Sequence, residues 1–585
     1  MSTKRKIYWG IILVLTSVTI GGWLAGWVSA YSPDYYHKLQ ENIEIFGRVY
    51  QEISKKYVEE VDPEKFMRAG IQGMLSTLDP YTVLVEKEDN QELQIMSSGK
   101  YGGLGMRIGL RGNLPTVVEP PFDGTPAIKA GIREGDQIIE VDGELTKGMN
   151  INKVAGFLRG EIGSEVFLKI QREGEEQPIE FRLIRAEIVV TDVVYSDMIQ
   201  DGIGLIRLSH FSRNAGRDLE KSIRDLRKNG LSALILDLRY NPGGLLDAAV
   251  AVAENFIDKG KLIVSTQGRT SGSEQNYHSQ TTPVLGDLPL VVLVNGLSAS
   301  ASEIVAGAIQ DLDRGVIIGS NTFGKGLVQT VIPISGEAHL KITTAKYLVP
   351  SGRSIQDPKK FLADSRDILY NPVEDGLEPE PQNVNKNKQD KVITDKKYFT
   401  ANGREVYSAS GIAPDIAIED EQLSRFAREL LRKTMPFQFG VVYAARHPEL
   451  QHRFEVDAEM LSEFKDFLKE KNFDYKSEAE LSLEKIEGIA KENEYLTSIS
   501  NPVAQLRAAI LEQKVDEFYK SQDFIKDELQ KEISAKLWGS KAEMESTFNH
   551  DKAIQKALQV LADSEQYNAV LNVAKPDSKK QKTKN

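Results

Sequence analysis

Apolar and polar positions follow two different periods along residues 200–320. Short apolar runs of strand length are separated by segments in which apolar positions recur at helical spacing. The predicted strands lie in GIGLIRLSHF, LSALILDLR, KLIVSTQ, PLVVLVNG and GVIIG, and the predicted helices lie in residues 214–229, LLDAAVAVAENFI and residues 300–312. Alternation of apolar strands with helices predicts an α/β layered core.

The chain before this core divides into a helical and a β-rich part. Residues 34 to about 96 carry two sets of apolar positions at helical spacing: Ile43, Ile45, Phe46, Val49, Tyr50 and Ile53, then Phe66, Ile71, Met74 and Leu75. From residue 101 to about 188, short strands alternate with glycine-rich turns: GLGMRI, TVVEP, QIIEVDG, VFLKIQ and IEFRLIRAEI. We therefore predict a small helical module followed by a compact β domain.

The chain after the core becomes helical and highly charged beyond about residue 420. Asp457 is placed to cap a helix whose Met460, Leu461, Phe464, Phe467 and Leu468 share one face. The stretch from Ser477 to Glu480 has the spacing of a capping box. Residues 366–395 are polar and lack apolar periodicity, which predicts a loop or insertion. The end, KPDSKKQKTKN, is typical of a disordered tail.

The N-terminus has the pattern of an export or membrane signal. Lys4, Arg5 and Lys6 precede an uncharged run from residue 7 to residue 28, which matches the length of about 20 residues that spans a bilayer. We expect a membrane anchor, and a signal peptide cut after Ala30 is the alternative, since Val-Ser-Ala resembles a cleavage site. The basic cluster would then stay in the cytoplasm, and the chain after residue 30 would lie outside the cytoplasm.

Composition narrows the function classes. The chain has 585 residues, is 41% hydrophobic and 27% charged, and carries a formal net charge of −12 with interspersed charges of both signs. This balance argues against nucleic-acid binding, which needs a basic face. The sequence has no cysteine, so disulfides, thiolate metal ligands and a cysteine nucleophile are excluded.

The stretch GSNTFGKG, residues 319–326, resembles a nucleotide-binding P-loop. That motif needs a hydroxyl after the lysine to hold magnesium, and a helix that begins there. Position 326 is glycine, and LVQTVIPI after it alternates with the period of a strand. We therefore reject the nucleotide interpretation and look for another role for Lys325.

A hydroxyl-rich turn lies one α/β unit upstream. Ser298, Ser300 and Ser302 stand between the strand PLVVLVNG and a predicted helix, where a serine is exposed at the sheet edge and the amide after it can stabilise an oxyanion. Ordinary helix capping is the alternative role for these serines. None of the seven histidines lies in a recognisable motif. Lys325 is flanked by glycines and lies two residues after Phe323, and it can replace histidine as the base if burial keeps its amine neutral. The alternative is that Lys325 is an ordinary solvent-exposed lysine in a loop.

A third element is DLRYNPGG, residues 237–244, where a buried strand ends in adjacent glycines. Such glycines permit unusual dihedral angles and an inward-pointing amide. Gly244 is therefore a candidate oxyanion donor alongside the amide of Ala301. A purely structural tight turn is the alternative.

Together, NGLSASASE, FGKGLVQ, DLRYNPGG and the β-rich domain that begins with YGGLGM resemble the carboxyl-terminal processing peptidases, or tail-specific proteases, over residues 40–356 and again over 398–416. The resemblance implies Ser300 as nucleophile, Lys325 as general base, Gln329 as the residue that orients the lysine, and the amides of Gly244 and Ala301 as the oxyanion hole. It also implies that no metal, nucleotide or other cofactor is required.

Residues 101–188 resemble a PDZ domain, which binds an extended C-terminal peptide along a sheet edge. The resemblance implies a carboxylate-binding loop at Gly103, Leu104, Gly105 and Met106, and a ligand-sensing arginine at Arg159. KYLVPSGRSIQ, 346–356, and YFTANGREVYSASGIAPDI, 398–416, look like two partial copies of one segment, and the polar insert between them is a candidate to shape the substrate channel.

The predicted fold is a multidomain α/β protein with a crotonase-like Ser/Lys protease core. The predicted divisions are a membrane anchor or signal segment (1–30), an N-terminal helical module (31–98), a PDZ domain (99–188), the protease core (189–419), a C-terminal helical domain (420–574) and a basic disordered tail (575–585).

The function that we predict is that of an envelope serine endopeptidase, exported to the periplasm and held at the inner membrane, that binds polypeptide substrates by their C-termini and cleaves them. The expected partners are those polypeptides, the membrane, and a homo-oligomer or adaptor bound through the helical flanks, with no nucleic acid. A catalytically silent PDZ scaffold that binds C-termini is the alternative, and a crotonase-like acyl-CoA enzyme is a second one that export disfavours.

Overall fold

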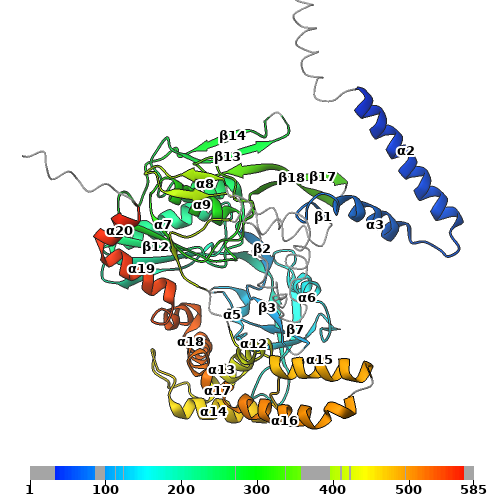
Figure 1. Ribbon diagram of the computed structural model, residues 1–585, viewed down its shortest axis with the longest axis vertical. Coiled ribbons are helices and arrows are strands. Elements are labelled where there is room, and N and C mark those ends of the chain that lie inside the picture. The colour runs from blue at the N-terminus through cyan, green and yellow to red at the C-terminus, as the bar shows by residue number, and fades with distance from the viewer. Residues whose placement is uncertain are drawn as a thin grey trace, which may run out of the picture. The chain divides into compact units, whose positions relative to one another are not determined.

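The computed structural model describes residues 33–85, 99–111, 113–122, 124–270, 272–335, 338–356, 396–408, 411–419, 423–493 and 496–571 (Figure 1). The chain divides into two compact units, residues 1–79 and 80–585. The predicted membrane segment, the insert at 366–395 and the basic tail lie outside the described residues. No helix within the described ranges is long and apolar enough to cross a membrane.

The first unit contains helices α2 (Pro33–Lys56) and α3 (Pro63–Leu75). Asp62 caps α3 by accepting hydrogen bonds from the amides of Glu64 and Lys65, and a proline occupies the first turn, where its missing N–H costs nothing. The rings of Tyr50 and Phe66 stack with centroids 5.5 Å apart and hold the two helices together.

The prediction of helices up to about residue 96 is wrong at strand β1 (Val83–Val85). This strand belongs to the second unit and pairs antiparallel with β18 (Ala338–Leu348). The run Thr-Val-Leu-Val is rich in β-branched residues, which favour a pleated surface. A run of only three strand residues carries too little periodicity to reveal itself in the sequence.

The core of the second unit is a six-stranded sheet that is parallel except at one edge. Its strands, in spatial order, are β10 (Val193–Gln200), β11 (Ile203–Leu208), β12 (Ala233–Asp237), β15 (Leu290–Val294), β16 (Val316–Gly319) and β21 (Ile416–Ala417). β10 pairs antiparallel with β11, and the other pairs are parallel. Every residue of β12, β15 and β16 is buried, as expected for parallel strands covered on both faces.

Helices cover both faces of this sheet. One face packs against α7 (Ala215–Lys228), α8 (Leu246–Ala253) and α9 (Ala301–Asp311), which confirms the predicted layered core. The other face packs against α19 (Lys552–Ala562) and α20 (Ser564–Val570), seen in red in Figure 1. These two helices lie within the predicted C-terminal helical domain (420–574) but pack on the core sheet, and the Tyr567 hydroxyl bonds the backbone of Leu290.

A second sheet lies beside the first and carries the lysine segment. It contains β1, β18, β13 (Leu262–Gly268), β14 (Gln275–His278) and β17 (Leu327–Ser335). β17 pairs antiparallel with β18 and begins two residues after Lys325. LVQTVIPI is therefore a strand, as predicted, and not the helix that a P-loop requires.

The β-rich region has its own hydrophobic core, separate from the α/β core. Its strands are β2 (Lys100–Gly103), β3 (Ile108–Arg111), β4 (Leu114–Val117), β5 (Gln137–Val141), β6 (Glu144–Leu145), β7 (Glu165–Gln171), β8 (Ile179–Ile184) and β9 (Ala186–Val189). Strands β3 to β8 form a six-stranded sheet, and β2 pairs with β9 in a separate two-stranded sheet. Two short helices, α5 (Pro126–Lys129) and α6 (Ile151–Leu158), contribute to the same hydrophobic core. The predicted compact β domain is confirmed.

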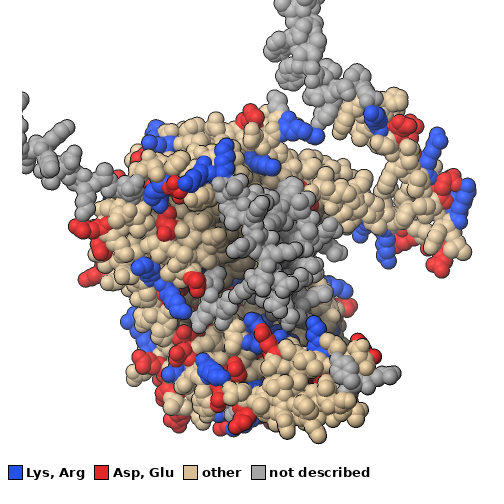
Figure 2. Space-filling model, in the orientation of Figure 1, with Lys and Arg blue, Asp and Glu red and all other residues tan. Residues whose placement is uncertain are grey.

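The C-terminal helices form a third core, around Phe426, Phe439 and Phe464. They are α12 (Arg425–Arg432), α13 (Met435–Arg446), α14 (Ala458–Glu470), α15 (Glu478–Glu492), α16 (Leu496–Val515), α17 (Glu517–Lys520) and α18 (Gln522–Thr547). Asp457 caps α14, and the capping box at the start of α15 forms as predicted. Acidic and basic side chains are interspersed on the face shown in Figure 2.

Candidate active site

Three turns meet where parallel strands of the core sheet end. They follow β12, β15 and β16, which are neighbours in the sheet. The carboxyl ends of parallel strands lie at one edge, where α/β proteins place their functional sites. Each of the three predicted motifs occupies one of these turns: residues 240–244, 295–300 and 320–325.

The three candidate serines have different environments. Ser298 and Ser302 are fully buried, and their hydroxyls donate to the carbonyls of Leu238 at 2.8 Å and Asn241 at 2.9 Å. These two serines therefore fasten the serine turn to the neighbouring turn. Ser300 alone of the three is partly exposed, and its φ of +55° lies in the left-handed region, which costs a non-glycine residue energy. Such strain at an exposed nucleophile candidate is typical of a functional turn.

Gly243 brings the second turn against the serine turn. Its φ is +100°, and a Cβ placed on it would lie 2.7 Å from the Ala299 carbonyl oxygen and 2.9 Å from the Ala301 amide nitrogen. Only glycine permits this approach. The two backbone segments are consequently in direct contact beside Ser300.

Gly244 forms a bridge to Phe211. The Phe211 amide donates to the Gly243 carbonyl at 3.1 Å, and the Leu245 amide donates to the Phe211 carbonyl at 2.9 Å. Neither bond uses the Gly244 amide. Among the described residues, no hydrogen bond uses the amide of Gly244 or of Ala301, so both remain able to donate to an oxyanion.

Lys325 meets Gln329 as the strand period predicts. The lysine Nζ lies 3.3 Å from Gln329 Oε1 and 4.5 Å from the ring centroid of Tyr81. The Gln329 Nε2 atom is buried without a hydrogen-bond partner in the described part of the chain. The aromatic ring and the amide oxygen together fix the position of the ammonium group.

Glu303 is a site residue that sequence reasoning missed. Its buried carboxylate accepts hydrogen bonds from the amides of Ser300 at 2.8 Å, Gly324 at 2.6 Å and Lys325 at 2.9 Å, and from the Thr322 hydroxyl at 2.5 Å. Burial raises the pKa of this carboxyl to about 7, against the opposing effect of the four donors. Glu303 therefore ties the serine turn to the lysine turn. The Ser-x-x-Glu spacing from Ser300, which is that of a capping box, could have revealed it.

Tyr347 is a second such link. Its buried hydroxyl lies 3.0 Å from the carbonyl oxygen of Ser300 and 2.5 Å from that of Lys325. Burial raises the pKa of the phenol well above its ordinary value, so the hydroxyl keeps its proton. No sequence motif marks this tyrosine, because its role depends on the pairing of β17 with β18.

The predicted peptide-binding residues of the β domain partly coincide with a groove of about 350 Å³. Leu104, Gly105 and Met106 line it on one side, and α6 and Arg159 line it on the other. The Arg159 guanidinium lies 5.6 Å from the ring centroid of Tyr101. Gly103 is paired within β2 and is not part of the lining. The structure therefore brings four of the five predicted residues together.

The two copied segments adopt the same turn. The Val349 amide bonds the Arg353 carbonyl, and the Thr400 amide bonds the Arg404 carbonyl, at 3.2 and 3.0 Å. Both arginines brace the C-terminal end of α9, by ion pairs of Arg353 with Asp311 and of Arg404 with Asp313 and Asp415. The repeat therefore supports the helix that begins at Ser300.

Comparison with known proteins agrees with this arrangement. Residues 202–361 match the model "Peptidase family S41", and residues 117–172 match "PDZ domain". Residues 426–561 match "Probable PDZ-protease, C-terminal helical domain", and residues 29–89 match "Activating protease CtpB N-terminal domain". The protein is thus a serine-type peptidase that carries a PDZ domain.

Similar proteins narrow this class. The chain is 40% identical over 315 residues to the carboxy-terminal-processing protease of Bartonella bacilliformis, which covers 53% of this chain and 72% of that protein. It is 36% identical over 311 residues to carboxy-terminal processing protease CtpB of Bacillus subtilis, covering 53% and 64%. The solved photosystem II D1 C-terminal processing protease is 30% identical, with a TM-score of 0.32 over 53% of this chain and 89% of that one. The chain belongs to the carboxy-terminal processing peptidases of family S41.

Proposed function

We propose that this peptidase cleaves polypeptides with a Ser300–Lys325 dyad. Neutral Lys325, oriented by Gln329, takes the proton of Ser300 as the serine oxygen attacks the scissile carbonyl carbon. The amides of Gly244 and Ala301 hold the resulting oxyanion. The amine product leaves with a proton, and water then hydrolyses the acyl-enzyme. The observation that carries this proposal is that Glu303 and Tyr347 each bond the backbone of both Ser300 and Lys325.

The substrate is proposed to be bound by its C-terminus. An extended peptide would lie in the groove between Leu104–Met106 and α6, with Arg159 beside it. Cleavage would then occur toward the tail of the same polypeptide. We further propose that residues 7–28 anchor the protein in the inner membrane and that the domains act in the periplasm, on the basis of the basic cluster and the uncharged run that follows it.

The test is cleavage of an unstructured polypeptide with an apolar C-terminus, followed by mass spectrometry. The full-length protein should cleave it, and Ser300→Ala and Lys325→Ala should each lose activity by at least about a thousandfold while remaining folded. Blocking the substrate's C-terminal carboxylate should strongly reduce cleavage. Binding without cleavage by the wild type would instead favour a catalytically silent PDZ scaffold.

The pH dependence gives a second readout of the same test. Because Lys325 acts as a base only when neutral, turnover should rise between about pH 6 and 9. A flat profile over that range would contradict a lysine base.

A further inference from the structure

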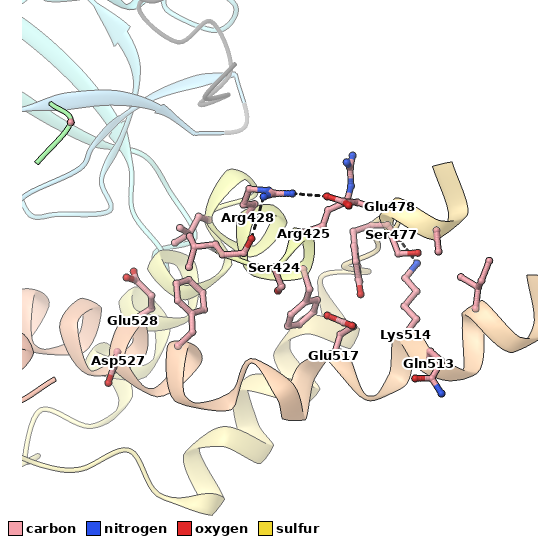
Figure 3. Close-up of a pocket in the computed structure, with 18 of the residues that line it drawn as sticks. Ser424, Arg425, Arg428, Ser477, Glu478, Gln513, Lys514, Glu517, Asp527 and Glu528 are labelled. Atoms are coloured by element: carbon pink, nitrogen blue, oxygen red, sulfur yellow. Dashed lines mark hydrogen bonds and ion pairs between the residues drawn. The ribbon is translucent and has the colours of Figure 1, made fainter. Parts of the chain in front are cut away.

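A large groove lies between two of the turns described above and the C-terminal helices. Figure 3 shows the side chains that the helical region contributes to its lining. Its volume is about 1500 Å³, above the roughly 300–1,000 Å³ of small-molecule sites. The turns after β12 and β15 form one wall, and α12, α15, α16, α17 and α18 form the rest. We call it the helical groove. Its size suits a segment of polypeptide.

The wall from the protease core consists of residues adjacent to the catalytic motifs. Tyr240 begins the turn that ends in Gly244, and Leu297 lies in the serine turn, three residues before Ser300. Both line the helical groove and are 60% and 51% exposed although they are large and apolar. Asn295 fixes both, because its Oδ1 accepts from the Tyr240 amide at 3.0 Å and from the Leu297 amide at 3.2 Å. Two exposed apolar side chains, whose backbone amides are both fixed by Asn295, therefore line the groove close to Ser300.

The backbone of Tyr240 supports a role for its exposed side chain. Its φ of +60° lies in the left-handed region, where a bulky residue is strained and glycine or asparagine would be more stable. Such strain persists where the surrounding structure enforces it, often at functional sites. The Tyr240 side chain is 60% exposed and lines the groove, and the Arg207 guanidinium lies 5.9 Å from its ring centroid.

The helical wall combines apolar side chains with charges of both signs. Leu506 and Ile510 of α16 contribute apolar surface. Arg428 of α12 reaches Glu478 at the start of α15, with 3.1 Å between guanidinium nitrogen and carboxylate oxygen, as Figure 3 shows. Lys514 lies further along the same wall. A mixed lining of this kind tolerates many polypeptide sequences and has no excess of either charge to select a polyanion.

The helical groove and the PDZ groove have no lining residue in common. A polypeptide whose C-terminus occupies the PDZ groove must extend past the catalytic turns, and its remaining length must leave them along another surface. We propose that the helical groove holds the part of the substrate N-terminal to the scissile bond, with Tyr240 and Leu297 as its first contacts. This inference rests on the proposed roles of Ser300 and the PDZ domain.

Two leucines on α16 provide a matched pair for the test. Leu506 lines the helical groove, whereas Leu511 does not, and they are 50% and 47% exposed. Leu506→Glu should lower kcat/KM by about tenfold for a long unstructured polypeptide, because a carboxylate replaces apolar contact with the substrate. Leu511→Glu should stay near wild type. A short peptide that contains the scissile bond but begins only a few residues before it should be cleaved equally by all three proteins.

The proposal would be overturned if Leu506→Glu lowered kcat/KM equally for the long and the short substrate, or if it lowered kcat/KM for neither. A change in sedimentation caused by Leu506→Glu alone would also overturn it, since it would make the groove a contact between copies of this chain.

A binding measurement separates this proposal from the dyad. A photoreactive amino acid at position 506 in the Ser300→Ala protein should cross-link to the long polypeptide upstream of its scissile bond, and the same group at position 511 should not. Cross-linking without any cleavage by the wild type would leave the groove proposal supported and refute the dyad. Cleavage by the wild type without cross-linking at position 506 would support the dyad and refute the groove proposal.

Discussion

Two buried carboxylates, Glu303 between the serine and lysine turns and Glu134 at the junction of the PDZ domain with α18, have opposite surroundings. Burial raises the pKa of each to about 7. Glu303 is surrounded by four uncharged donors from the residues around it. Glu134 has an ion pair with Lys536 at 2.9 Å, and its Oε2 has no hydrogen-bond partner among the described residues.

The different partners of Glu303 and Glu134 indicate different structural roles for the two buried carboxyl groups. The donors to Glu303 come from a helix start and a loop of one rigid core, so the carboxylate fixes the geometry of a site. Glu134 and Lys536 are 402 positions apart in sequence, and each side chain is only 5% exposed, so their pair joins two separately folded regions. Val441 of α13 packs against Gly135 at the same junction. Hydrogen bonds from neutral donors thus fix the turns around Glu303, whereas ion pairing and apolar packing together join the PDZ domain to the C-terminal helices.

The largest effect is expected from Glu303→Ala. It removes the acceptor of four buried donors, each of which costs about 1–3 kcal/mol when unsatisfied, and releases both catalytic turns. Peptide hydrolysis should fall by at least about a hundredfold, and urea unfolding should show a loss of several kcal/mol. Glu303→Gln keeps one acceptor oxygen, so its hydrolysis rate and its unfolding free energy should both lie between those of Glu303→Ala and the wild type. Wild-type turnover in Glu303→Ala would show that Glu303 does not position the site.

A smaller effect is expected from Lys536→Ala at the junction. Removing Lys536 leaves the Glu134 carboxyl buried without its cation, at a cost of up to about 3–5 kcal/mol above pH 7, where the carboxyl is charged, and less at lower pH, where it takes up a proton. The matched control is Lys541→Ala on the same helix, since Lys541 pairs with Asp197 at the surface and should cost no more than about 1 kcal/mol. Both costs are measured by urea unfolding. Equal costs in the two variants would contradict a buried pair that joins the two regions.

The smallest effect is a change in the pH dependence of stability. Because the pKa of Glu134 rises from its ordinary 4.5 to about 7 on folding, the folded chain retains a proton that the unfolded chain releases between these values. The stabilisation that protonated Glu134 contributes to the folded state is fully present below about pH 4.5 and is lost as the pH rises to about 7. Over this range the unfolding free energy should fall by up to about 1.4 kcal/mol per pH unit. Glu134→Gln should therefore make the fall shallower in urea unfolding at several pH values. An unchanged or steeper slope would contradict this assignment.

Most local structure followed from the sequence because short-range rules govern it. The strand–helix alternation, the caps at Asp457 and Ser477 and the strand after Lys325 depend on neighbouring residues and appear where the pattern predicts them. The serine, lysine and glycine motifs stood out because their residue types and spacing are specific. That specificity made the family recognisable before any contact was known.

The sequence by itself therefore determined the class of peptidase, the PDZ domain and the candidate dyad. The tertiary structure alone decided which serine stays accessible, since Ser298 and Ser302 are occupied by carbonyls about sixty residues away. It also decided the roles of Glu303 and Tyr347, the packing of α19 and α20 on the core sheet, and the helical groove. These features depend on which faces meet across long separations in the chain, and an apolar period identifies a face without identifying its partner.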